Sequence, residues 1–182
     1  MSSPRLRVSA LKNRNDDYVE LRARSAFSFL RGASAPEELV ARAAALDFPA
    51  LAFGDRGGFY GAPRFHRAAT KAGLRALVGA EVSVAAAGDA PACGLYLLAA
   101  SRQGYRNLCR ILTDAALRAA KGEALARWDD FDGRSDGLIC LAGGADGPLA
   151  RAFPADPLPR LGRLFPGRLY VDLQRHLDPA QE

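Results

Sequence analysis

The most informative segment of this 182-residue chain is Tyr18-Val19-Glu20-Leu21-Arg22-Ala23-Arg24-Ser25-Ala26-Phe27-Ser28-Phe29-Leu30-Arg31-Gly32-Ala33-Ser34. Residues 18–23 alternate in type with a period of two, which is typical of a β-strand. Ser34 and Glu37 have the spacing of a helix capping box, and Pro36 suits the first helical turn. The loop between this strand and helix carries Arg24, Ser25, Ser28, Arg31 and Gly32. In α/β folds, loops at the carboxyl ends of strands are where functional sites are built.

Strand and helix patterns alternate along the rest of the chain. Apolar residues at helical spacing predict helices at residues 37–46, 62–72, 103–117 and 156–164. Short apolar runs predict strands at residues 50–53, 77–84, 95–99, 138–141 and 169–173. Gly73 is expected to end the second helix. This alternation predicts an α/β domain with a parallel sheet.

The composition is that of one globular domain with an ordinary share of charged residues, 25%. No apolar run is long enough to span a bilayer, and the basic start is not followed by a signal-peptide core, so we expect a cytoplasmic protein with no membrane partner. The three cysteines, Cys93, Cys109 and Cys140, are widely spaced and form no CxxC pair. They are expected to be buried thiols, not disulfides or zinc ligands.

The formal net charge of +5 is compatible with nucleic-acid binding but modest in size. Basic and aromatic residues do not interleave along the sequence as they do in a platform that stacks bases. Direct contact with nucleic acid is therefore the less favoured interpretation. Residues 1–17 show no clear period, and we expect a flexible leader there, followed by one domain over residues 18–182.

Several segments resemble one protein family, in the right order. Phe27-Ser28-Phe29-Leu30-Arg31-Gly32-Ala33-Ser34 resembles the first motif of the PHP (polymerase and histidinol phosphatase) domain that opens bacterial C-family DNA polymerase alpha subunits, the error-prone branch in particular. Residues 52–57, 78–82, 104–110 and 169–177 resemble further segments of these proteins. The resemblance covers nearly the whole chain. It implies a distorted (β/α)7 barrel, and an incomplete one, because the family's domain continues beyond the last of these segments.

The resemblance also implies a metal site whose ligands have changed. Active family members resemble multinuclear metallohydrolases that hold Zn or Mn with imidazoles and carboxylates. Their first motif usually begins His-x-His-Ser, and many have Asp before the Gly; this chain has Arg22, Arg24 and Arg31 at those positions. An arginine side chain has no free lone pair and stays charged, so it cannot bind a cation.

Two carboxylates remain as weak metal-binding candidates. In the second motif, where Asp-His-Gly is common, this chain has Asp55 followed by Arg56. The family's Gly-x-Glu segment keeps its carboxylate as Glu81, inside an apolar strand. Glu81 is either a surviving metal ligand or the partner of an arginine, and the second is favoured because arginine suits buried bidentate pairs. We expect Asp55 and Glu81 to meet at one barrel mouth, with Arg22 or Arg24 paired to Glu81 and no metal or other cofactor bound.

No catalytic residue can be assigned elsewhere. With two histidines, the chain has no arguable Ser-His-Asp or Cys-His arrangement. His66 is expected on a helix surface, and His176 in a turn or interface. Residues 143–147 lack the Lys-Ser/Thr ending of a phosphate-binding loop and are expected to form a simple turn.

The resemblance implies the N-terminal PHP domain of an error-prone DNA polymerase III alpha subunit, a nucleotidyltransferase of DNA replication, repair and translesion synthesis. In such a protein the domain supports the remaining polymerase modules and reaches DNA only through them. The chain alone is expected not to polymerise DNA. Because an open barrel would leave an unpaired strand edge near residues 169–173, the isolated chain is expected to self-associate.

Three alternatives differ in class. The first is a metal-dependent phosphoesterase or 3′–5′ exonuclease, which would require bound metal. The second is a stand-alone protein whose arginine cluster holds an anion. The third is a gene fragment without function, which would fold poorly.

Overall fold

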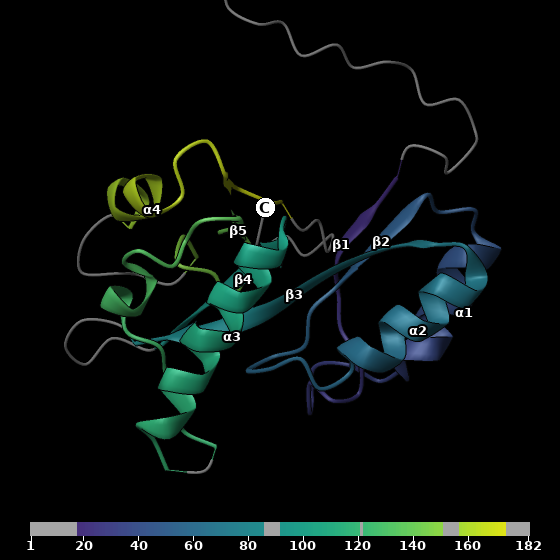
Figure 1. The fold of residues 1–182 in the computed structure, drawn as a ribbon, viewed down its shortest axis with the longest axis horizontal. Helices are drawn as coiled ribbons and strands as arrows, with labels where there is room; N and C mark the ends of the chain where they lie inside the picture. The colour runs from purple at the N-terminus through teal and green to yellow at the C-terminus, as the bar shows by residue number, and fades with distance from the viewer. Residues whose placement is uncertain (1–17, 86–91, 121, 151–156, 174–182) are drawn as a thin grey trace, which may run out of the picture.

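The computed structural model describes residues 18–85, 92–120, 122–150 and 157–173 (Figure 1). The predicted leader and His176 lie outside these residues. The elements are β1 (Glu20–Ala23), α1 (Pro36–Ala45), β2 (Ala50–Phe53), α2 (Ala62–Ala72), β3 (Arg75–Val84), β4 (Cys93–Ala99), α3 (Arg102–Leu117), the 3₁₀ helix η2 (Trp128–Phe131), β5 (Leu138–Leu141), α4 (Leu158–Leu164) and β6 (Leu169–Tyr170). No helix in the described ranges is long and apolar enough to cross a bilayer.

The six strands form one curled sheet in chain order, β1-β2-β3-β4-β5-β6, so the predicted α/β class and incomplete barrel are confirmed. The sheet is mixed, however, and the prediction of a parallel sheet was wrong. Strand β4 runs antiparallel to both β3 and β5, whereas the β1–β2, β2–β3 and β5–β6 pairs are parallel. The reason is the length of the β3–β4 connection, residues 85–92, which is too short for the crossover that parallel neighbours need.

Side chains alternate between the two faces of the sheet, as strand geometry requires. The face covered by helices carries two apolar clusters: Leu51 and Phe53 pack with α1 and α2, and Leu95 and Leu97 pack with α3. The concave face holds a smaller cluster of Ala52, Tyr96, Leu98 and Leu141. Figure 1 shows α1 and α2 over the β1–β2 end of the sheet and α3 over the β4 region.

Some element ends differ from the sequence prediction. The cap of α1 is Ala35, not Ser34, and the side chain of Glu38 accepts a hydrogen bond from the Ala35 amide at 2.8 Å. Helix α2 ends as predicted at Gly73, which adopts the left-handed conformation with φ 70°. The last strand is only two residues long, shorter than the predicted 169–173, and Asp172 beyond it accepts a hydrogen bond from Arg22 of β1.

Candidate functional site

Three of the four arginines that the sequence singles out gather around one pocket of about 250 Å³ at the concave side of the sheet. This mouth pocket is lined by Arg22, Arg24, Arg31, Glu81, Gly94, Gly144, Ala145, Asp146 and Gly147. Its residues come from β1 and the loop after it, from β3 and β4, and from the loop after β5. Each of its three arginines forms an ion pair with a carboxylate from a distant part of the chain.

Glu81 is the buried carboxylate that two arginines approach. Its carboxylate is 3% exposed and accepts a hydrogen bond from the guanidinium of Arg24. The Nε of Arg56 lies 3.7 Å from the same carboxylate. Of the two predicted partners of Glu81, Arg22 and Arg24, the one that pairs with it is Arg24, which directly follows β1. Together with Arg56, two positive charges compensate one buried negative charge. The Nε of Arg24 is itself buried and has no hydrogen-bond partner among the described residues.

Arg22 links β1 to the carboxyl ends of β5 and β6. Its Nη2 donates to the carbonyl oxygens of Leu141 and Gly143, at 3.1 and 2.9 Å, and to Asp172 Oδ1 at 2.9 Å. The guanidinium carbon lies 5.0 Å from the ring centroid of Tyr96, whose pKa is raised by burial. Strands β1 and β6 are not neighbours in the sheet, so this arginine bridges the gap that backbone hydrogen bonds do not close.

Gly143 lets β5 and the end of β6 approach closely enough for this bridge. A Cβ placed on Gly143 would lie 1.8 Å from the carbonyl oxygen of Asp172, so no side chain fits there. Its amide also donates to Asp172 Oδ1 at 2.8 Å. Residues 143–147, predicted as a simple turn, thus take part in the site. The same loop supplies Asp146, which accepts a hydrogen bond from Arg31 and raises the pKa of that guanidinium.

Asp55 does not line the mouth pocket, contrary to the prediction that it meets Glu81 there. Its fully buried carboxylate accepts hydrogen bonds from the amide and hydroxyl of Ser25, the hydroxyl of Ser28 and the amide of Gly61, all at 2.8–3.0 Å. The next residue, Arg56, is the one that approaches Glu81. Consecutive residues of extended chain point to opposite sides, so Asp55 organises the loops on the helix side instead.

Residues 20–176 match the family model of the PHP domain. The chain belongs to the PHP domain family. It is 38% identical over 174 residues to an error-prone DNA polymerase of Anaeromyxobacter sp. strain K, and 35% identical over 178 residues to the DNA polymerase III subunit alpha of Caulobacter vibrioides. These alignments cover 91% and 90% of this chain, but the chain spans only 15% and 16% of those relatives.

Two solved structures share a similar fold with this chain. One is a putative metal-dependent phosphoesterase from Bifidobacterium adolescentis, with a TM-score of 0.53 and 13% identity over 80% of this chain and 73% of the other. A second is an amidohydrolase from Chromobacterium violaceum with bound sulfate and no metal, with a TM-score of 0.52 and 18% identity over 79% and 71% of the two chains. At these identities the likeness concerns the fold alone.

The residues of this PHP domain do not fit a metal centre. In the described parts of the chain, no group of three or more His, Cys, Asp or Glu side chains could hold an ion. The two carboxylates that line the mouth pocket, Glu81 and Asp146, are each bound by a guanidinium. A divalent cation would have to displace an arginine from each carboxylate against the repulsion of its charge. The pocket also presents no nucleophile with an adjacent base.

Sequence reasoning missed two of the residues that complete this site, Asp146 and Asp172. Asp146 follows the predicted strand at residues 138–141, where a carboxylate can reach a shared mouth, whereas Asp172 lies inside the predicted strand at residues 169–173. Three other predictions are confirmed: His66 is exposed on α2, and Cys93 and Cys140 are buried. Cys109 is only half-buried, so the prediction was wrong for this thiol.

Proposed function

We propose that this chain is the PHP module of an error-prone C-family DNA polymerase, and that the module supports the polymerase instead of hydrolysing phosphate esters. Homology to error-prone polymerases and to a DNA polymerase III subunit alpha, over 90% or more of the chain, supports the first part. The second part rests on one observation. All three arginines of the mouth pocket stand in ion pairs, at positions where active family members place metal ligands.

These ion pairs can replace a metal as the link between strands. Arg24 connects the end of β1 to β3, Arg22 connects β1 to the segment after β6, and Arg31 connects the β1–α1 loop to the loop after β5. A metal cluster joins such loops by drawing several ligands to one charge. Here fixed guanidinium groups provide the positive charge, and each forms its own pair. The module keeps a closed mouth and loses the means to generate hydroxide.

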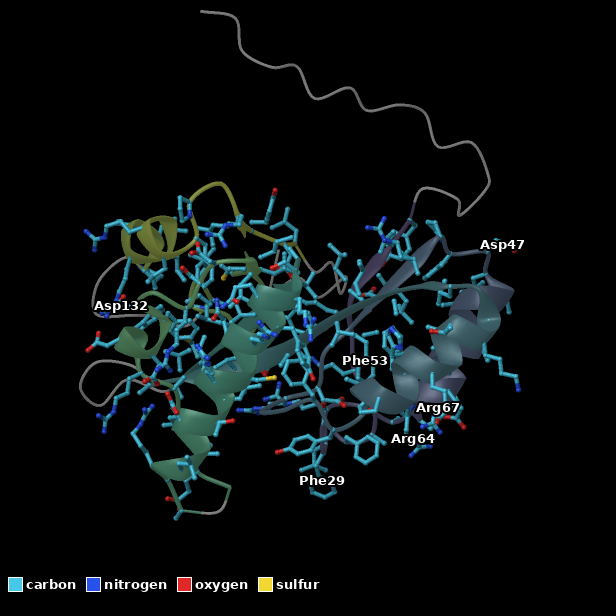
Figure 2. The ribbon with its side chains drawn as sticks, in the orientation of Figure 1. Phe29, Asp47, Phe53, Arg64, Arg67 and Asp132 are labelled. Atoms are coloured by element: carbon cyan, nitrogen blue, oxygen red, sulfur yellow. The ribbon has the colours of Figure 1, made fainter. Side chains whose placement is uncertain are left out.

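The exposed apolar residues of the domain support attachment to further modules. Phe29 and Leu30, at the tip of the β1–α1 loop, are 83% and 86% exposed, and Figure 2 shows Phe29 at the rim of the molecule. Tyr170, Val171 and Leu173, at the end of β6, are 55%, 52% and 92% exposed. We infer that other polymerase modules in the cytoplasm cover these residues. In isolation the same residues would favour self-association.

The test compares metal content, stability and hydrolysis in the purified chain. We expect well under one Zn or Mn per chain by elemental analysis, and no change in melting temperature when chelator is added. We also expect no Mn-dependent hydrolysis of p-nitrophenyl phosphate and no 3′–5′ degradation of labelled single-stranded DNA. Stoichiometric metal whose removal lowers stability, or metal-dependent hydrolysis, would establish the phosphoesterase alternative and refute the proposal.

The anion-binding alternative finds limited support in the pocket. Three guanidinium groups line it, but Glu81 and Asp146 line it too, and Asp172 compensates Arg22 from behind. An anion would therefore compete with carboxylates already in place. Phosphate should leave the melting temperature of the chain unchanged in the same stability assay, whereas a rise would favour this alternative.

A further inference from the structure

A second concave surface lies outside the mouth pocket, between α2 and α3. This groove has a volume of about 830 Å³ and is lined by Ala62, Pro63, His66, Arg67, Thr70, Lys71, Val78 and Tyr105. Its walls are the two helices, and Val78 of β3 lies between them. None of the arginines of the mouth pocket lines it, so it is a separate site on the helix-covered side of the sheet.

Two cations line the groove, and three more lie on α3 outside its lining residues. Arg67 and Lys71, one helical turn apart on α2, are exposed and form no ion pair or hydrogen bond with the described residues. Helix α3 carries Arg102, Arg106 and Arg110 at intervals of four residues, also exposed and also unpaired within the described chain. In contrast to these five residues, nine other arginines of the described chain form ion pairs.

Acidic residues that could neutralise this surface are absent or engaged. Helix α2 has no acidic residue, and the one acidic residue of α3, Asp114, pairs with Arg134 at 2.5 Å. Glu37 of α1 lines a neighbouring hollow together with Arg67 and Lys71, but its carboxylate accepts two hydrogen bonds from Arg64, at 2.7 and 2.8 Å. Figure 2 shows Arg64 and Arg67 together at the outer edge of α2. Free like charges along two neighbouring helices match a ligand that carries several negative charges in a row.

An aromatic side chain also faces the groove. Tyr105 lines it from α3 and is 42% exposed, while its ring is held against Phe59 with the centroids 4.7 Å apart. The imidazole of His66 lines the groove from α2. Tyr105 is far from the α2 cations in the sequence, and His66 is a single ring beside them. The sequence therefore shows no alternation of rings and cations. The tertiary structure brings a fixed ring and free cations to one surface, which is the combination that single-stranded nucleic acids require.

We propose that the α2–α3 groove binds single-stranded DNA, with Arg67 and Lys71 on its phosphates and Tyr105 against an unpaired base. A base in a duplex is stacked and cannot reach Tyr105, so the single strand is the better ligand. The choice of DNA over another polyanion rests on the proposed role in a polymerase. DNA binding is tested by fluorescence anisotropy, whereas the proposed role in a polymerase is tested by metal content and hydrolysis. Either proposal can therefore fail without the other.

The test measures fluorescence anisotropy of a labelled 20-nucleotide oligothymidylate titrated with the full chain at several salt concentrations. The variant Arg67→Gln/Lys71→Gln should bind more weakly, and the slope of log K against log salt should become less steep by about 1.4, because each lost phosphate contact removes about 0.7. Tyr105→Leu should reduce affinity for the single strand and leave the salt slope unchanged, since a leucine cannot stack but no charge is lost.

The matched control is Arg127→Gln/Arg163→Gln, which removes the same charge from exposed positions near η2 and α4. It should bind as the original chain does, and circular dichroism should show all variants folded. Equal loss in the groove and control variants would mean attraction by net charge alone and would overturn the proposal. So would the absence of binding, a preference for duplex, or equally effective competition by poly-glutamate, which would favour an acidic protein as the ligand.

Discussion

Replacing Glu81 by alanine tests whether ion pairs hold the mouth of the barrel together. The Glu81 carboxylate is 3% exposed and is shared by Arg24 and, at 3.7 Å, by Arg56. Removing it leaves the Arg24 guanidinium, itself 19% exposed, without its counter-ion. Its Nε already has no partner among the described residues, so the group has little means of compensating.

The expected cost is about 3 kcal/mol of unfolding free energy, the lower end of the range for breaking a buried ion pair from one side. For a domain of this size, that loss should lower the melting temperature by roughly 6–12 °C. In urea, with a slope of about 2 kcal/mol per molar, the midpoint should fall by about 1.5 M. The double variant Arg24→Met/Glu81→Leu removes both charges and should lose less than Glu81→Ala alone, because no unpaired charge stays buried.

Urea denaturation followed by circular dichroism, with melting curves beside it, measures each variant. The control is Glu37→Ala, which breaks an ion pair whose carboxylate is 44% exposed and should leave both transitions unchanged. A loss below about 1 kcal/mol for Glu81→Ala would show that the buried pair does not hold the mouth. A double variant less stable than Glu81→Ala would refute the argument that an unpaired charge causes the loss.

Two further predictions concern other buried groups. Asp55→Asn should cost about 2 kcal/mol or more in the same denaturation assay, because an amide offers one acceptor oxygen in place of two to the donors of Ser25, Ser28 and Gly61; full stability would contradict the structural role of this carboxylate. Burial raises the pKa of the Cys140 thiol to about 12, so at pH 8 this thiol stays protonated and should react with a thiol reagent only after unfolding, as the buried Cys93 should also do. The half-buried Cys109 should react first in the native chain, and rapid labelling of all three cysteines would contradict this order.

Much of the fold follows from local patterns in the sequence. The apolar runs of β2 and β5 match their predicted bounds, and Gly73 ends α2 as its left-handed conformation requires. These features depend on residues close together in the chain, where periodicity and backbone sterics act directly. The antiparallel direction of β4 follows from the short β3–β4 connection. The overall alternation of strand and helix patterns pointed instead to a parallel sheet.

The site was accessible from the sequence only in part. That Arg22, Arg24, Arg31 and Arg56 cannot bind metal follows from the chemistry of the guanidinium group alone. Their partners could not be read in the same way, because Arg22 meets Asp172 across 150 residues and Arg31 meets Asp146 across 115. Sequence spacing carries no signal for such contacts, which exist only because the sheet curls.

The residue types therefore determined that the arginines of this mouth cannot bind metal, and the tertiary structure decided which carboxylates they pair with. Neighbouring positions show the difference most directly: Asp55 lies on the helix side among hydroxyl and amide donors, and Arg56 reaches the buried carboxylate of Glu81. The alternation of the extended chain sets their opposite directions, but which direction faces the mouth depends on how β1, β2 and β3 pack together. The same holds for the α2–α3 groove, which Tyr105 and Lys71 both line only because two helices cover one face of the sheet.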